Sequence, residues 1–201
     1  NGSTLNATGI ISGTGDLEIA PGGALNFTNP GANYFHNTIR NHGTADWSIG
    51  DVSPCYAGNF VNEATGLLVI GGTGSRYWKT TNMTNYGTIE KNTSATIAIN
   101  PYVGCPPYST VFNNTGTGVI NIGSGALSLY GSGTHSGTFN NSGALNFHDT
   151  QVLATSGNVT GAGALNLIGT TTIDIDYTFL SPVVNLTGTL TGSGKRTIPN
   201  G

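Results

Sequence analysis

Charged residues are scarce in this 201-residue chain, which has 6 Lys and Arg and 9 Asp and Glu residues. With a formal net charge of −3, the chain lacks the clustered positive charge with which proteins bind nucleic acid. No apolar run approaches the ~18 residues of a membrane span. The N-terminal residues also lack the basic start and apolar core of a signal peptide. We therefore expect neither nucleic-acid binding nor membrane insertion.

The sequence also lacks the apolar spacing of three and four residues that marks an amphipathic helix. Glycine supplies 32 residues, and helix interiors do not tolerate glycine and β-branched threonine at this density. Hydrophobic residues make up 36% of the chain, more than is usual in a disordered protein, and they alternate in short runs. These patterns predict an all-β protein.

One phrase recurs along the chain: an apolar residue, a spacer, an asparagine, and then a small residue that leads into alternating apolar positions. Its copies start at Ile39, Phe60, Met83, Phe112 and Phe139. A shorter phrase, Gly-Ala-Leu-x-apolar, starts at Gly23, Gly125, Gly143 and Gly163. A β-sandwich built from hairpins also suits short strands with glycine turns, but it has no reason to repeat one phrase every twenty to thirty residues.

The repeats predict a single domain over residues 1–201, an all-β, right-handed parallel β-helix (β-solenoid) of about eight coils with loop insertions on one flank. Such a domain is either one segment of a longer protein or one subunit of a fibre. Inward Leu, Ile, Val and Phe would stack on the equivalent residues of the neighbouring coil. Asn and Gly would occupy the corners, because they tolerate left-handed backbone angles best.

The asparagines of the longer phrase share one position, and their amides are predicted to form a ladder at one corner. The predicted members are Asn41, Asn62, Asn85, Asn114 and Asn141. Each amide would bond to the backbone of the next coil. The alternative is that asparagine simply suits a turn.

The Gly-Ala-Leu-Asn-Phe and Asn-x-Gly-Thr phrases resemble those of repeat-rich bacterial surface proteins, such as autotransporter passenger domains and filamentous-haemagglutinin-type adhesins. The resemblance covers most of the chain and is one of repeat style. It implies an exported right-handed β-helix that acts as an adhesin or a rigid stalk. The chain departs from that family in carrying no outer-membrane barrel and no secretion segment.

Five segments exceed the repeat and are predicted to be insertions stacked along one flank: 28–38, 50–59, 71–82, 100–111 and 130–138. They are rich in aromatic residues, which suit sugar stacking and protein contact. The predicted ligand or subunit contacts are Tyr34, Tyr56, Tyr77, Trp78, Tyr102 and Tyr108. The alternative is that these rings fold back and form a small separate core.

The two cysteines, Cys55 and Cys105, lie in two of these segments, each beside a proline. We predict a disulfide between them, which fits an oxidising, extracellular compartment. The alternatives are two free thiols or bonds between subunits.

Catalytic patterns are weak. Glycoside hydrolysis generally needs two carboxyl groups across a cleft, and only Asp174 and Asp176 form a close pair on one strand face. The four histidines show no metal-ligand spacing. We therefore expect no enzyme activity, cofactor or metal. The expected function is that of an extracellular or cell-surface structural or adhesive rod, with end-to-end self-association or host and matrix glycans as partners. A polysaccharide-binding or polysaccharide-degrading β-helix is the alternative.

Overall fold

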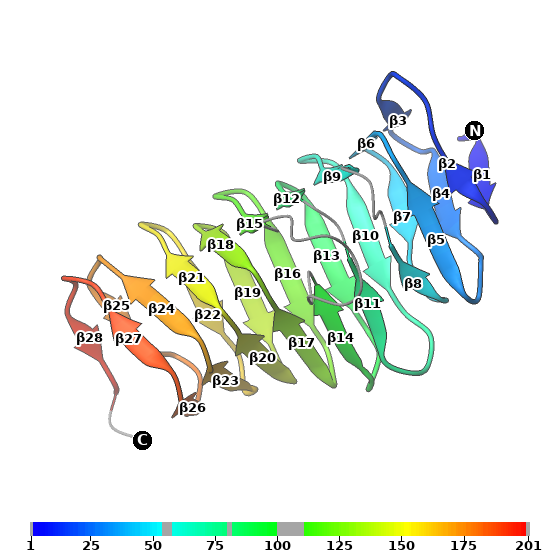
Figure 1. Ribbon diagram of the computed structural model, residues 1–201. Coiled ribbons are helices and arrows are strands. Elements are labelled where there is room, and N and C mark those ends of the chain that lie inside the picture. Colours follow the sequence, from blue (N-terminus) through cyan, green and yellow to red (C-terminus); the bar gives the residue numbers. More distant parts are fainter. Residues whose placement is uncertain (1, 54–57, 80–81, 100–110, 200–201) are drawn as a thin grey trace.

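The computed structural model describes residues 2–53, 58–79, 82–99 and 111–199. Within these ranges every regular element is a β-strand. The strands follow one another in triplets, and the three members of a triplet enter three different sheets. Each triplet pairs in parallel with the triplet before it. The chain is therefore a β-solenoid, as predicted, and its coils stack into a rod with the two termini at opposite ends (Figure 1).

The three sheets run along the rod. The first contains β1 (Thr4–Ala7), β4 (Ala24–Phe27), β7 (Thr44–Asp46), β10 (Leu67–Ile70), β13 (Thr88–Lys91), β16 (Val119–Ile122), β19 (Thr138–Asn141) and β22 (Asn158–Thr160). The second contains β2 (Ile10–Ile11), β5 (Ala32–Phe35), β8 (Asp51–Val52), β11 (Arg76–Trp78), β14 (Thr96–Ile99), β17 (Ala126–Leu129), β20 (Ala144–Phe147), β23 (Ala164–Leu167) and β26 (Val183–Leu186). The third contains β3 (Leu17–Ile19), β6 (Thr38–Asn41), β9 (Asn59–Asn62), β12 (Asn82–Asn85), β15 (Val111–Asn114), β18 (Ser132–His135), β21 (Thr150–Leu153), β24 (Thr170–Ile173) and β27 (Thr189–Thr191). A small fourth sheet pairs β25 (Tyr177–Thr178) with β28 (Arg196–Thr197).

The described strands form nine triplets, from β1–β3 to β25–β27, whereas about eight coils were predicted. Four triplets, β1–β3, β16–β18, β22–β24 and β25–β27, carry no copy of the asparagine phrase, so the phrase alone does not give the number of coils. Successive strands of the first sheet begin 19 to 23 residues apart, except that 31 residues separate Thr88 from Val119. The extra length of that coil lies between β14 and β15.

Four of the five predicted insertions contain regular strands of the coils and are not loops. Segment 28–38 includes β5, 50–59 includes β8, 71–82 includes β11, and 130–138 includes β18. Three of these strands carry a polar residue at an inward, buried position, which hid the apolar alternation: Asn33 on β5, Arg76 on β11 and His135 on β18. The fifth segment, 100–111, lies almost wholly outside the described residues.

The interior is filled by every second residue of most strands, as the alternation of buried and half-buried positions shows. Its N-terminal half is aromatic. Trp78 is fully buried, and its ring centroid lies 5.0 Å from that of Phe60, 5.1 Å from that of Trp47 and 5.6 Å from that of Phe27. These edge-to-face contacts join three different coils and all three sheets.

Glycine occupies the corner before the first sheet because neighbouring coils approach closely there. A Cβ atom on Gly87 would lie 2.3 Å from the carbonyl oxygen of Gly66, the corner glycine of the preceding coil. Left-handed backbone angles are not the reason for asparagine at the corners. Asp149, with φ of 50°, is the one non-glycine residue with a positive φ in the part of the chain that the structure describes.

A buried asparagine ladder lies at the end of the third sheet, where the chain turns into the first sheet. Asn41 donates its amide N–H to Oδ1 of Asn62, Asn62 to Asn85 and Asn85 to Asn114, each over 2.8 Å. The same amides also donate to the carbonyl oxygens of first-sheet residues in the next coil, such as Thr88 at 2.9 Å. All four side chains are fully buried. The ladder is thus confirmed for these four residues.

Asn141 is not a member of this ladder, and that part of the prediction is wrong. It lies on β19 in the first sheet and pairs with Ile122. Its amide donates to the carbonyl oxygen of Ala164, on the second-sheet strand β23 of the next coil, over 2.8 Å. Asn141 therefore joins two coils at the corner between the first and second sheets, as the ladder asparagines do at the corner between the third and first sheets.

His135 takes the ladder position after Asn114. Its ring is completely buried, stacks on Phe147 with a centroid distance of 5.2 Å, and donates from Nε2 to Oε1 of Gln151 over 2.8 Å. Burial lowers its pKa to about 4, and the hydrogen bond to Gln151 opposes the shift only in part. The interior is therefore more polar here than around Trp78.

The first sheet is interrupted after β22. The backbone N–H of Val159 donates to the phenol oxygen of Tyr177 over 3.0 Å, and β25 pairs with β28 in the separate fourth sheet. Burial raises the pKa of the Tyr177 phenol. The second and third sheets alone continue through the last coils.

We predict that Asn85→Ala lowers the free energy of unfolding by about 2–5 kcal/mol. The substitution leaves the Asn62 amide and the Asn114 carbonyl without one partner each inside the rod. The control is Asn140→Ala on the exposed face, where the side chain bonds to Asn121 and Thr160 but water replaces these bonds. Its cost should stay below about 1 kcal/mol in urea unfolding. Equal losses would contradict a special role for the buried ladder.

We predict that stability falls as the pH is lowered from about 6.5 to about 4. Unfolded His135 binds a proton near its ordinary pKa of 6.5, whereas the folded side chain resists protonation until about pH 4. The full loss is about 3 kcal/mol. In His135→Gln, an uncharged amide can still donate to Gln151, and the urea midpoint should depend less on pH over this range. An unchanged pH dependence in His135→Gln would contradict the assignment of this loss to His135.

Candidate functional site

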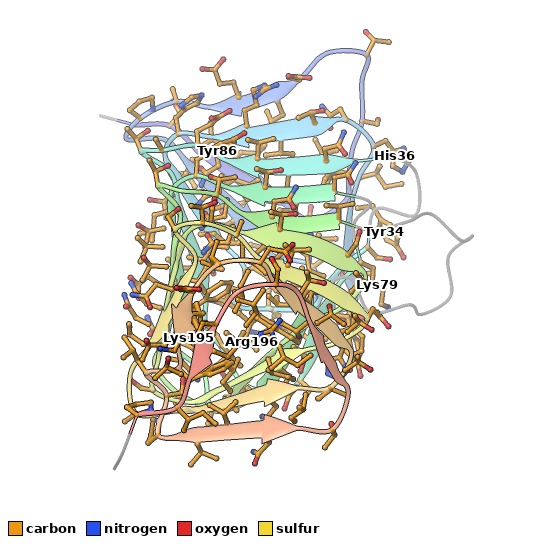
Figure 2. All side chains as sticks on the ribbon, turned by 90° about the vertical axis from the view of Figure 1, so that its left-hand side faces the viewer. Tyr34, His36, Lys79, Tyr86, Lys195 and Arg196 are labelled. Carbon is orange, nitrogen blue, oxygen red and sulfur yellow. The ribbon has the colours of Figure 1, made fainter. Side chains whose placement is uncertain are left out.

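One column of side chains follows the strands of the second sheet, at the corner that leads into the third sheet. In the described part of this column, the residue directly after a strand donates its backbone N–H to the preceding coil, as Lys79 does to Val52 O (2.7 Å), Tyr130 to Ile99 O (3.0 Å) and His148 to Leu129 O (2.9 Å). We call this set the flank column. It consists of Ser53, Lys79, Tyr130, His148 and Ile168, and Tyr34 on β5 lies in the same column. Figure 2 shows Tyr34, His36 and Lys79 along one edge of the rod and Tyr86 at the opposite edge.

The flank column combines rings with a cation. The rings of Tyr130 and His148 stack face to face, 3.9 Å apart with an angle of 10° between their planes. Burial lowers the pKa of His148, against the pull of Asp149, and so favours the neutral ring. Burial, with the negative charge of Asp149, raises the pKa of the Tyr130 phenol. Both rings are therefore uncharged at neutral pH and suited to apolar stacking.

Asp51 organises the neighbouring part of the flank. Its Oδ2 atom lies 3.1 Å from Nζ of Lys79, and its Oδ1 atom accepts the backbone N–H of Tyr77 over 3.0 Å. The Lys79 ammonium also lies 5.4 Å from the centroid of the Tyr77 ring. An exposed ring and an anchored cation are thus presented together, an arrangement that offers both stacking and hydrogen-bond donors.

The structure places the predicted contact residues in different environments. Tyr77 is 39% exposed on the outward face of β11, and Tyr34 is half-buried on β5. Trp78 is fully buried, so the expectation that it contacts a ligand or subunit is wrong. Adjacent strand residues point to opposite faces, and Tyr77 holds the outward position. Tyr56, Tyr102 and Tyr108 lie outside the described residues, as do Cys55 and Cys105 with their predicted disulfide.

Tyr130 and His148 were not among the predicted contacts. Their signal was present in the shorter repeat phrase, because each residue directly follows a Gly-Ala-Leu-x-apolar copy. The phrase at Gly163 places Ile168 in the same column. Aligning the residue after these three copies would have found Tyr130, His148 and Ile168, whereas the copy at Gly23 lies on β4 in the first sheet.

Two cations lie inside the rod and serve its structure. Lys91 is fully buried, and its ammonium donates to the carbonyl oxygens of Thr93 and Ser124. Burial, followed by repulsion from Arg76, lowers its pKa to about 8. Arg76 is 5% exposed and bonds to the carbonyl oxygens of Gly71 and Thr73. Carbonyl oxygens at the corners therefore solvate both side chains.

The close carboxylate pair is bound to backbone groups. Asp174 accepts the backbone N–H of Ser193 over 3.0 Å, and Asp176 accepts that of Lys195 over 2.9 Å. Asp149 accepts the N–H of Gly131 over 2.8 Å in the same manner. These carboxylates hold adjoining coils together at their corners.

No group of three or more His, Cys, Asp and Glu side chains among the described residues is arranged to hold a metal ion. In the same ranges no helix is long and apolar enough to cross a membrane. No protein-family model, curated protein or solved structure matches the chain. The resemblance to bacterial surface β-helices is therefore confirmed for the β-solenoid fold alone.

We predict that Trp78→Ala lowers the free energy of unfolding by about 3–5 kcal/mol, since it removes the centre of the aromatic interior. The matched control is its neighbour Tyr77→Ala, which should cost less than about 1 kcal/mol because that ring is outward. Urea unfolding followed by circular dichroism checks both. A milder effect of Trp78→Ala than of Tyr77→Ala would contradict the assignment of faces.

Proposed function

We propose that the protein is a non-enzymatic, extracellular structural rod that attaches to glycans along the flank column. The observation that carries this proposal is the column itself, which places rings and a cation on one edge of a regular stack of coils. Coils repeat roughly every 4.8 Å, so an extended polymer lying along the rod meets side chains at regular intervals. Regular spacing suits a repetitive ligand such as a polysaccharide.

The use of polar side chains elsewhere supports a structural role. Besides the buried ladder, a second ladder on the outside of the second sheet runs from Asn185 to Asn166, then to Asn146 and Ser128, with bonds of 2.6–2.9 Å. Asp16, Arg40 and Glu63 form a chain of ion pairs across three coils. Amides and carboxylates are thus used mainly to join one coil to the next.

An extracellular location is part of the proposal and is supported by the low charge and the Asn-, Thr- and Gly-rich composition. Labelling intact cells of the source organism with an antibody against the rod tests it. Staining that requires permeabilised cells would contradict a surface location.

We expect the double substitution Tyr77→Ala/Tyr130→Ala to reduce glycan binding at least about tenfold, because it removes the exposed ring and half of the stacked pair. Binding is measured on a glycan array and then by calorimetry with the best glycan. The control is Tyr86→Ala, which removes a ring with 41% exposure from the opposite edge. Retained binding in the double variant, equal loss in the control, or no glycan bound by the wild type would each contradict attachment through the flank.

A further inference from the structure

An open hollow lies along the flank column, at the corner between the second and third sheets. Its volume of about 530 Å³ is within the range of protein sites for small molecules. Three successive coils line it with the residues that directly precede β21, β24 and β27 and with the first residue of each of these strands. The hollow is thus built from one corner of the coil, repeated three times.

Glycine keeps this corner free of side chains in two of the three coils. Gly169 and Gly188 hold equivalent positions, since each directly precedes a strand of the third sheet. A Cβ atom on Gly169 would lie 2.2 Å from the carbonyl oxygen of Asp149, and one on Gly188 would lie 2.1 Å from that of Gly169. Neighbouring coils pack too closely here for a side chain, and the space beside the backbone stays open.

Asp149 holds the same position in the first of the three coils. Its φ is 50°, and Gly131, the equivalent residue of the coil before it, has a φ of 75°. The left-handed region strains an aspartate but not a glycine. The backbone alone therefore favours glycine at this position, and the reason for an aspartate lies in its side chain.

The Asp149 carboxylate is fixed by one hydrogen bond and keeps further acceptor sites. Its Oδ2 atom accepts the backbone N–H of Gly131 over 2.8 Å. A carboxylate can accept about four hydrogen bonds, and the Asp149 side chain is exposed at the edge of the hollow. A ligand in the hollow can therefore donate hydrogen bonds to an acceptor that is already oriented.

Apolar surface lies before the corner and hydroxyl groups lie after it. The His148 ring is held flat against Tyr130, and Ile168 in the next coil is 39% exposed. The first residues of β21, β24 and β27 are all threonines and are paired in register, so their side chains form a row. A pyranose ring has an apolar C–H face and a rim of hydroxyl groups, and the hollow offers partners for both.

The charge of the hollow selects against acidic sugars. Among the described residues that line it, Asp149 carries the charge, because burial favours the neutral form of His148. Lys79, the cation of the flank column, lies three coils or roughly 14 Å further along. That separation exceeds the screening length of about 8 Å at physiological salt. A carboxylate or sulfate group on a sugar is thus repelled, whereas a hydroxyl group donates to Asp149.

We propose that the hollow binds a neutral pyranose residue, with its hydroxyl groups donating to Asp149 and its ring against His148 and Ile168. The inference rests on the proposed attachment to glycans and names the class of sugar that the flank recognises. The Tyr77 ring lies three coils away from the hollow, so one extended glycan chain contacts the two places through different sugar residues.

Titration with small glycosides tests the hollow directly. The methyl glycosides of glucose, galactose and mannose are the neutral probes. Methyl glucuronide, in which a carboxylate replaces the hydroxymethyl group of methyl glucoside, is the acidic probe. NMR spectra of the 201-residue chain should show shifted amide signals of Gly169 and Gly188 with at least one neutral probe. Methyl glucuronide should bind at least about tenfold more weakly than the best neutral probe.

Asp149→Asn removes the charge but not the local structure, since asparagine tolerates a positive φ and its side-chain oxygen can accept the Gly131 N–H. It should weaken binding of the best neutral probe about tenfold and reduce the preference over methyl glucuronide. The matched control is Asp174→Asn, because that carboxylate also accepts a backbone N–H but lies outside the hollow. The control should bind both probes like the wild type, and circular dichroism should show both variants folded.

Three results would overturn the inference: equal losses in Asp149→Asn and Asp174→Asn, tighter binding of methyl glucuronide than of the neutral probes, or unshifted Gly169 and Gly188 signals with every neutral probe. If the signals stay unshifted while the glycan array shows binding that the Tyr77→Ala/Tyr130→Ala variant loses, the attachment stands and the hollow does not. Shifts at the hollow without any binding on the array would instead support the sugar site and contradict the attachment of the rod.

Discussion

The coil-to-coil register is the constraint on which the rest of the structure depends. Each residue lies roughly 4.8 Å from its equivalent in the next coil, so every position is surrounded by residues of its own column. Asparagine suits such a column, because one amide both donates and accepts, as Asn62 does between Asn41 and Asn85. Like charges in one column would repel, which explains why charged residues are scarce and why Asp16, Arg40 and Glu63 alternate in sign.

The repeat phrases were sufficient to predict the β-solenoid and four members of the buried ladder. They did not reveal which sheet contains Asn141, because the sequence pattern of strand, corner and next strand is the same at all three corners of a coil. The first four copies of the phrase lie on strands of the third sheet. The copy that follows the long coil beginning at Thr88 lies instead on β19, in the first sheet. Which sheet a phrase belongs to depends on pairing between coils, and the local sequence does not contain that information.

To locate the candidate site, the alternation of side chains along each strand and the register between coils are needed more than the residue types. Tyr77 and Trp78 are neighbours with similar chemistry, yet one is outward and the other lies at the centre of the interior. Only the pairing of β11 with β8 and β14 decides which is which. In the same way, Tyr130 and His148 are eighteen residues apart in sequence and become a stacked pair because their coils adjoin. The composition indicates that the chain contains aromatic residues, but the register between coils determines which of them lie next to one another on the surface.

The interruption at Tyr177 has a mechanical consequence. Up to β22 all three sheets hold each coil to its neighbour. At the step from β22 to β25 the second and third sheets continue, the bond from Val159 to the Tyr177 phenol takes the place of the first-sheet ladder, and β25 then pairs with β28. Resistance to peeling depends on how many backbone bonds must break together. A load applied along the rod would therefore open the coils after Tyr177 first, and the aromatic interior around Trp78 would remain closed at forces that separate the last turns.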